Sequence, residues 1–272
     1  MMTNKYAFIG GGNMGQAIIS GLVSAKRTDV SNIIVADPSQ EVRNHCAKNL
    51  GIQTCPSNQD AILDADVVIF AVKPQHMHSV ISELKFKKGS TYLFISIAAG
   101  IRLDHLERLL GKNQAIVRCM PNTPALVHSG ISVLVATEET SAAQRLQAET
   151  LLQSVGKTIW IEDEALMDAV TAVSGSGPAY FFLLIELIQK AGIRLGLPSE
   201  LAETLAVETA VGAAKLAQQS PDTASELRQK VTSPQGTTDA ALNIFSNSGL
   251  EDIVNLAITA ARDRSIALSK EN

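Results

Sequence analysis

Aromatic residues make up only 4% of this 272-residue sequence, whereas apolar residues as a whole make up 46%. Charged residues account for 18% and leave a net charge of -4, so the basic surface that nucleic acids require is not expected. No apolar run approaches the roughly 20 residues of a membrane span, and the N-terminus lacks the pattern of a secretory signal. The composition therefore predicts a globular protein with a substantial core that binds neither nucleic acid nor membrane.

Cysteine is also rare, with three residues, Cys46, Cys55 and Cys119, that follow no metal-ligand spacing. The five histidines are scattered along the chain, so we expect no bound metal. Cysteines without a pairing pattern are typical of a reducing compartment, and we therefore expect a cytoplasmic protein.

Two patterns divide the chain. In the first part, apolar strand-like runs such as Tyr6–Ile9 and Asp66–Val72 alternate with helical patterns such as Glu41–Leu50. This alternation predicts an α/β fold with a doubly wound, mostly parallel sheet over residues 1–163. In the second part nearly every segment has helical spacing, so we expect an all-helical domain over residues 164–272.

The helical part contains a segment that is too apolar to face water. The predicted helix Ala179–Leu195 is apolar nearly all round, apart from a few polar positions. A helix of this kind is either central in its domain or shared with another subunit. We therefore expect a homodimer that forms through residues 164–272.

A glycine-rich turn follows the first predicted strand and opens a predicted helix. Its pattern is GxGxxG, with glycines at Gly10, Gly12 and Gly15. The first permits a tight turn, the second lets the backbone approach a pyrophosphate, and the third lets helix and strand pack closely. Asn13 and Met14 lie between these glycines and are further candidate contacts to the cofactor. In this context the pattern predicts a Rossmann-type dinucleotide-binding domain.

An acidic residue ends the second predicted strand. Asp37 lies 22 residues after Gly15, where a carboxylate can bond the adenine ribose 2′-OH and favour NAD over NADP. The alternative is a turn or helix N-cap role, which the neighbouring Pro38 supports. Arg43 is the nearest arginine that follows.

Later strand ends carry further candidate contacts, because the loops after parallel strands line the cofactor crevice. Val72, Lys73 and Pro74 follow one strand, Ala98 follows the next, and Asn122 follows a third. Lys73 is either a catalytic acid or a cofactor-positioning residue, and the adjacent proline favours positioning. Asn122 stands between two prolines that stiffen its loop. It either makes polar contacts to nicotinamide or substrate, or belongs to a stiff connector.

The segment Val231–Ala240 (VTSPQGTTDA) combines hydroxyls, a proline and a glycine just before an apolar helical run. The amides and hydroxyls of such a loop converge at a helix N-terminus, where an anion binds. We therefore predict that this loop contacts the substrate.

A second glycine-rich turn, Ser174–Ala179, opens the long apolar helix. Hydroxy-acid dehydrogenases with a similar two-domain layout carry a lysine one turn into that helix to transfer the alcohol proton. The first lysine of this helix is Lys190. The sequence therefore lacks a lysine at the position where it would accept the proton during alcohol oxidation.

Taken together, these motifs resemble those of pyrroline-5-carboxylate reductase, over essentially the whole chain. The resemblance implies reduction of 1-pyrroline-5-carboxylate to L-proline, the last step of proline biosynthesis, with the family's usual NADPH. It also implies a homodimer formed through the helical domain, often assembled into a pentamer of dimers. The segments that carry the resemblance are Gly10–Gly15, Ala71–Gln75, Ser96–Ile101, Arg118–Ala125, Ser174–Tyr180 and Val231–Thr238.

The resemblance also implies roles for individual residues. Ser233 and three backbone amides would hold the substrate carboxylate, and these amides belong to Gly236, Thr237 and Thr238. The Thr238 hydroxyl would hydrogen-bond the ring nitrogen, which makes it the candidate catalytic contact. Asn58 would contact the adenosine ribose or its phosphate. The residues that would border the nicotinamide half are Val72, Lys73, Pro74 and Ala98, with Asn122 nearby.

Two features depart from the family pattern. Gln235 stands where the family usually has glycine, and it is strained if that position needs a positive φ. Asp37 argues for NADH, so NADH stays open beside NADPH. Two alternative functions also stay open: a related imine or β-hydroxy-acid reductase, and a non-catalytic regulator that senses the dinucleotide.

Overall fold

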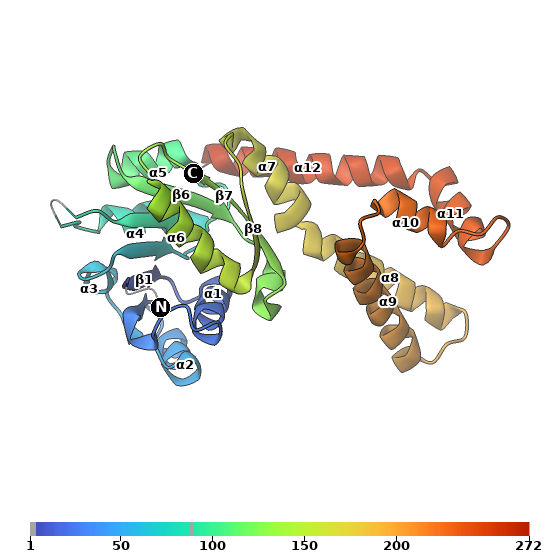
Figure 1. The fold of residues 1–272 in the computed structure, drawn as a ribbon, viewed down its shortest axis with the longest axis horizontal. Coiled ribbons are helices and arrows are strands. Elements are labelled where there is room, and N and C mark those ends of the chain that lie inside the picture. The colour runs from blue at the N-terminus through green and yellow to red at the C-terminus, as the bar shows by residue number, and fades with distance from the viewer. Residues whose placement is uncertain (1–3, 88–89, 272) are drawn as a thin grey trace. The chain divides into compact units, whose positions relative to one another are not determined.

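The computed structural model describes residues 4–87 and 90–271 (Figure 1). The chain forms two compact units. The first unit contains the chain up to Ser176 together with the part from Ala261 onward, and the second contains Gly177–Ala260. The chain therefore leaves the first unit and returns to it within its last helix, α12 (Leu250–Glu271).

The first unit is built on one eight-stranded sheet in the order β3-β2-β1-β4-β5-β6-β7-β8. Neighbouring strands run parallel except β6 and β7, which are antiparallel. The predicted doubly wound, mostly parallel sheet is confirmed. The strands are β1 (Tyr6–Ile9), β2 (Ile33–Ala36), β3 (Gln53–Cys55), β4 (Val67–Phe70), β5 (Leu93–Ser96), β6 (Ala115–Met120), β7 (Gly130–Ala136) and β8 (Gly156–Trp160).

Helices cover both faces of the sheet. Successive residues of a strand point to opposite faces, so each strand contributes side chains to both layers of helices. Tyr6 and Phe8 pack with α1, α2 and α6 on one face, whereas Ala7 and Ile9 pack with α3, α4, α5 and α7 on the other. All four β1 side chains are fully buried, as expected for a central parallel strand. These helices are α1 (Asn13–Ser24), α2 (Gln40–Leu50), α3 (Asn58–Ile62), α4 (Met77–Ser82), α5 (Leu103–Leu110), α6 (Ala142–Leu152) and α7 (Met167–Val170).

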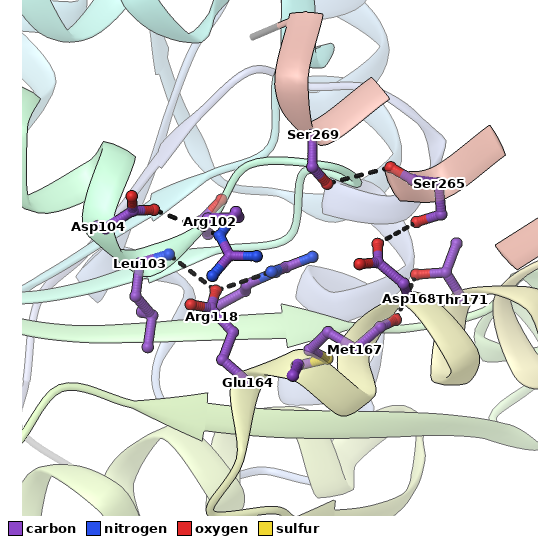
Figure 2. A network of polar contacts seen from close by, with 12 residues as sticks. Arg102, Leu103, Asp104, Arg118, Glu164, Met167, Asp168, Thr171, Ser265 and Ser269 are labelled. Carbon is purple, nitrogen blue, oxygen red and sulfur yellow. Dashed lines mark hydrogen bonds and ion pairs between the residues drawn. The ribbon is translucent and has the colours of Figure 1, made fainter. Parts of the chain in front are cut away.

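A polar network holds the segment after the sheet to the first unit (Figure 2). Glu164 Oε1 accepts hydrogen bonds from Arg118 Nη1 at 2.7 Å and from Leu103 N at 2.8 Å. The Arg118 side chain is almost fully buried, so this pair ties β6 to the start of the helical segment. One turn later, the Asp168 carboxylate accepts a hydrogen bond from Ser265 Oγ at 2.7 Å, which fastens the end of α12.

This network explains why the expected boundary between residues 163 and 164 differs from the division between the compact units. The division falls between Ser176 and Gly177. The Met167 side chain is fully buried against the sheet, and a π-helical turn, Thr171–Gly175, follows before the chain leaves the unit. The change from strand to helical pattern marks the end of the sheet, but this first helical turn still packs on the sheet.

The second unit is all-helical and has almost no core of its own. Among its described residues, the buried apolar side chains are those of Ala202 and Ala206. Large apolar side chains are exposed instead, including Phe181 at 68% and Leu256 at 71%. An exposed apolar surface of this extent marks an interaction site. The helices are α8 (Gly177–Arg194), α9 (Ser199–Gln219), α10 (Ala224–Lys230), α11 (Thr237–Asn247) and the first part of α12.

One helical stretch, Glu164–Arg194, is long and apolar enough to cross a membrane by length and composition alone. No such span was expected from the sequence, because the segment Ser174–Pro178 interrupts the apolar run. The apolar side chains of this stretch lie largely in the second unit, which exposes apolar residues on its other helices as well. The exposed apolar surface is thus shared by several helices and is not confined to this stretch.

Candidate active site

The candidate cofactor residues of the first unit lie at one edge of its sheet. β1 to β6 are all parallel, so the loops that leave them emerge at the same carboxyl edge. β1 lies between β2 and β4 in the sheet, and the strand order therefore reverses beside it. Ligands of open α/β sheets bind in the crevice at such a reversal.

The glycine-rich loop is shaped by close backbone packing. Gly10 has φ +100°, and a Cβ there would lie 2.7 Å from the carbonyl oxygen of Ala71, in the loop after β4. A Cβ on Gly15 would lie 3.2 Å from the carbonyl oxygen of Gly10. Gly12 differs from both, because a Cβ there would meet nothing within 4 Å. Gly10 is required by the fold and Gly15 permits a tight approach, whereas Gly12 leaves open space.

The same loop ends in the N-terminus of α1, with Gly12 as the N-cap. The first intrahelical hydrogen bond runs from Gln16 N to Gly12 O at 3.0 Å, so the amides of Asn13, Met14 and Gly15 precede it. Amides at this position, together with the helix dipole, favour a phosphate. Gln16 Nε2 also donates to Gly11 O at 2.7 Å and stiffens the loop. Gln16 was not among the residues expected to shape the loop, and its signal in the sequence is its position directly after the GxGxxG pattern.

The Asp37 carboxylate is bound to the backbone on both oxygens. Its Oδ2 accepts a hydrogen bond from Gly11 N at 2.9 Å, and its Oδ1 accepts one from Ser39 N at 2.9 Å. Arg43 Nη1 donates to the carbonyl oxygens of Asp37 and Pro38 at 2.6 and 2.9 Å. Asp37 therefore ties the glycine-rich loop to the end of β2, which agrees with the turn role considered in the sequence analysis. Each carboxylate oxygen retains capacity for a further hydrogen bond.

The other strand ends complete this edge. Asn58 is the first residue of α3, just after β3, and is partly exposed. Lys73 is exposed and is the N-cap of a short 3₁₀ turn that begins at Pro74. Val72 Cγ1 lies 3.0 Å from the position of a Cβ on Gly10, so the loops after β1 and β4 touch. Ala98, after β5, is 5% exposed.

Asn122, after β6, has protein partners on both side-chain atoms. Its Oδ1 accepts a hydrogen bond from Ile131 N at 2.9 Å, and its Nδ2 donates to Ser174 O at 3.1 Å. The carboxamide thus joins the β6–β7 connection to the π-helical turn. This favours the connector role among the two that the sequence left open.

The hydroxyl-rich loop lies in the second unit, where it opens α11. Gly236 is the N-cap, and the first intrahelical hydrogen bond runs from Ala240 N to Gly236 O at 3.0 Å. The amides of Thr237 and Thr238 precede that bond and are suited to an anion. The Gly236 amide differs, because it donates to Ser233 O at 3.0 Å. A Cβ on Gly236 would lie 2.5 Å from Ser233 Oγ, so only glycine lets the Ser233 hydroxyl lie this close to the helix start.

The cysteines offer no reactive group. Burial raises the pKa of the Cys119 thiol to about 12, and burial also raises the pKa of Cys46 and Cys55. These thiols are therefore protonated at neutral pH and are poor nucleophiles. Within residues 4–87 and 90–271, no three His, Cys, Asp or Glu side chains gather as metal ligands.

The sheet order, the glycine-rich loop and its helix define a dinucleotide-binding protein of the doubly wound α/β class. Two family models match the chain. Residues 5–100 match a model described as NADP oxidoreductase, coenzyme F420-dependent, and residues 164–268 match one described as pyrroline-5-carboxylate reductase dimerisation. The chain belongs to the pyrroline-5-carboxylate reductase family.

Relatives and solved structures of the same family cover the chain from end to end. The chain is 47% identical over 271 residues to a pyrroline-5-carboxylate reductase of Pseudomonas aeruginosa, covering 100% of this chain and 99% of the relative. A Coxiella burnetii pyrroline-5-carboxylate reductase structure has a TM-score of 0.93 at 39% identity, over 98% and 99% of the two chains. A Plasmodium falciparum pyrroline carboxylate reductase with NADP bound has a TM-score of 0.88 at 30% identity, over 99% of both.

The two kinds of glycine in the loop predict opposite effects of a methyl group. Gly10→Ala places a side chain at a positive φ against a backbone oxygen and should lower the free energy of unfolding by about 2 kcal/mol or more. Gly12→Ala meets no protein atom and should change stability by less than about 1 kcal/mol. It should nevertheless weaken dinucleotide binding at least about tenfold, because the methyl group fills the space of the pyrophosphate.

Denaturant unfolding and calorimetric titration with the dinucleotide measure the two effects separately. Unchanged affinity in Gly12→Ala would show that no phosphate approaches this backbone.

Proposed function

We propose that this protein reduces 1-pyrroline-5-carboxylate to L-proline, the last step of proline biosynthesis, with a reduced nicotinamide dinucleotide. The observation that carries the proposal is the loop at the start of α11. There the Ser233 hydroxyl lies against Gly236, where any Cβ would displace it, and the amides of Thr237 and Thr238 follow directly at the helix start. A hydroxyl and two helix-start amides suit a small carboxylate.

The reaction needs little acid–base catalysis from the protein. The ring nitrogen of the imine accepts a proton before reduction, and hydride then adds to the carbon of the C=N bond. The electron pair of that bond moves to the protonated nitrogen, which leaves a secondary amine and the oxidised dinucleotide. The protein must hold the carboxylate and the ring nitrogen so that the carbon faces the nicotinamide. The proposed contact to the ring nitrogen is the Thr238 hydroxyl.

We assign the cofactor to the carboxyl edge of the first unit. The pyrophosphate would bind at the start of α1, where Gly12 leaves space and Asn13, Met14 and Gly15 supply amides. The adenosine half would lie toward Asp37 and Asn58. The residues proposed to border the nicotinamide half are Val72, Lys73, Pro74 and Ala98, with Asn122 supporting the adjacent connection.

NADPH is the proposed cofactor, with NADH as the alternative. The match of residues 5–100 to an NADP oxidoreductase family and the NADP in the Plasmodium falciparum relative support NADPH. Asp37 is the residue that favours NADH, since its carboxylate repels a 2′-phosphate. The amides of Gly11 and Ser39 already donate hydrogen bonds to that carboxylate.

Substrate assays test the proposal directly. Pyrroline-5-carboxylate should oxidise NADPH in the presence of the protein, whereas pyruvate-type keto acids should not. Turnover of a keto acid alone would favour the hydroxy-acid reductase. Dinucleotide binding without turnover of any imine acid would favour the regulator.

The Thr238→Ala variant tests the proposed catalytic contact. Loss of the hydroxyl removes one hydrogen bond to the ring nitrogen, so kcat/KM for pyrroline-5-carboxylate should fall at least about tenfold, or about 1.4 kcal/mol of transition-state stabilisation. Steady-state kinetics with saturating NADPH measure the change. An unchanged kcat/KM would remove Thr238 from the mechanism.

The Asp37→Ser variant tests whether the Asp37 carboxylate recognises the 2′-hydroxyl of the adenine ribose. Serine keeps a hydrogen-bond acceptor for the loop but removes the charge, so the ratio of kcat/KM with NADPH to that with NADH should rise. The expected change is about fivefold or more, the size of one screened charge contact. Equal ratios in the variant and the parent protein would show that Asp37 only stiffens the loop.

The helical unit supports a homodimer, and a pentamer of dimers is the proposed further assembly. The exposed apolar side chains of α8, α9, α11 and α12 are the surface that self-association would cover, and the dimerisation match spans residues 164–268. A cytoplasmic location is also proposed, since Cys46, Cys55 and Cys119 are all free thiols.

Sedimentation velocity tests the assembly. Because the unit lacks a core that could support it alone, the folded protein at low micromolar concentration should sediment as a dimer or larger species. A stable, folded monomer under these conditions would contradict the expectation.

A further inference from the structure

The loop at the start of α11 contains a residue in an unusual backbone conformation. Gln235 has φ +62°, in the left-handed region that ordinary residues rarely adopt and glycine adopts freely. The chain holds this conformation without glycine, the residue that favours it. Some other contact must stabilise the left-handed state.

The turn around Gln235 shows what the conformation does. Gly236 N donates to Ser233 O at 3.0 Å, which closes a four-residue β-turn with Pro234 and Gln235 in the middle. A positive φ at the third residue, after proline at the second, is the pattern of a type II turn. This turn brings the Ser233 hydroxyl to the N-terminus of α11. If Gln235 left the left-handed region, the turn would open and the hydroxyl would move away from the helix amides.

A carboxylate from α11 supplies the stabilising contact. Asp239 Oδ2 accepts a hydrogen bond from Gln235 N at 3.0 Å. Asp239 lies in the first turn of the helix, where the helix dipole favours a negative charge, and it is partly buried. The carboxylate is thus anchored at the helix start and reaches back to the one residue of the turn that needs support.

We propose that Asp239 is a positioning residue for the substrate carboxylate. By binding the Gln235 amide it keeps the turn closed, and the closed turn keeps Ser233 beside the amides of Thr237 and Thr238. Asp239 does not touch the substrate in this account. The proposal rests on the proposed function, because it assigns Asp239 a role in binding pyrroline-5-carboxylate.

Two substitutions at these positions should act as a coupled pair. Asp239→Ala should raise KM for pyrroline-5-carboxylate about tenfold, the order by which the left-handed state of an ordinary residue is disfavoured. KM for NADPH should stay within about twofold, since the cofactor residues are in the other unit. In the Gln235→Gly background the same change should raise KM only about twofold, because glycine occupies the left-handed region without help.

Further variants separate positioning from general damage. Asp239→Asn retains an acceptor for the Gln235 amide and should stay within about threefold of the parent KM. Gln235→Val should raise KM about tenfold with Asp239 intact, because a β-branched side chain disfavours a positive φ. This arm tests the proposal even if Asp239→Ala does not fold. Asn113→Gly is the matched control, since Asn113 also has a positive φ, +64°, but lies in the first unit, and it should leave both KM values unchanged.

Each outcome decides the proposal. An unchanged KM in Asp239→Ala overturns it while leaving the proposed function intact. An equal rise in KM on Asp239→Ala with and without the Gln235→Gly substitution also overturns it. Equal KM values for Gln235→Val and Gln235→Gly overturn it as well, and neither result affects the proposed function. A parent protein that does not turn over pyrroline-5-carboxylate overturns the proposed function and this proposal together.

Discussion

The close packing of the glycine-rich loop against the loop after β4 is the constraint on which the rest of the sheet's carboxyl edge depends. Gly10 turns the chain at the end of β1 with its Cα so near the carbonyl oxygen of Ala71 that a methyl group would overlap it. This approach brings the loops after β1 and β4 together at the point where the strand order reverses. Asp37 then fixes the loop from the other side through the Gly11 amide. A rigid loop flanked on both sides fixes the first amides of α1 in a position that suits a phosphate.

The second unit is subject to a different constraint, because among its described residues only two alanines form a buried apolar core. Its helices expose phenylalanine and leucine side chains while burying alanines. The need to cover this surface explains why a segment with the length and composition of a membrane span occurs in a protein whose relatives are pyrroline-5-carboxylate reductases. The first unit is therefore stabilised by the core around its own sheet, whereas the apolar surface of the second unit marks an interaction site.

Much of the fold and of the candidate site could be predicted from sequence, because the strong signals are local. β1 is a clear apolar run and was predicted with the observed bounds, whereas β3 and α3 were missed because such short elements carry too little pattern. The return of α12 was missed because it depends on a contact between distant residues, Asp168 and Ser265. Both candidate ligand loops were proposed from their residue types, but the side chains that bind their backbones, Gln16 and Asp239, were not noticed. A glutamine or aspartate in the first turn of a helix is common, and only the geometry shows that it reaches back to the loop.

The central claim is that a carboxylate-binding loop selects the imine that the dinucleotide reduces. The most direct test compares kcat/KM for pyrroline-5-carboxylate with that for 1-pyrroline, which has the same C=N bond and no carboxylate. Charge-assisted hydrogen bonds to the carboxylate predict a preference of at least about 100-fold for pyrroline-5-carboxylate. Equal kcat/KM values for the two imines would contradict the account.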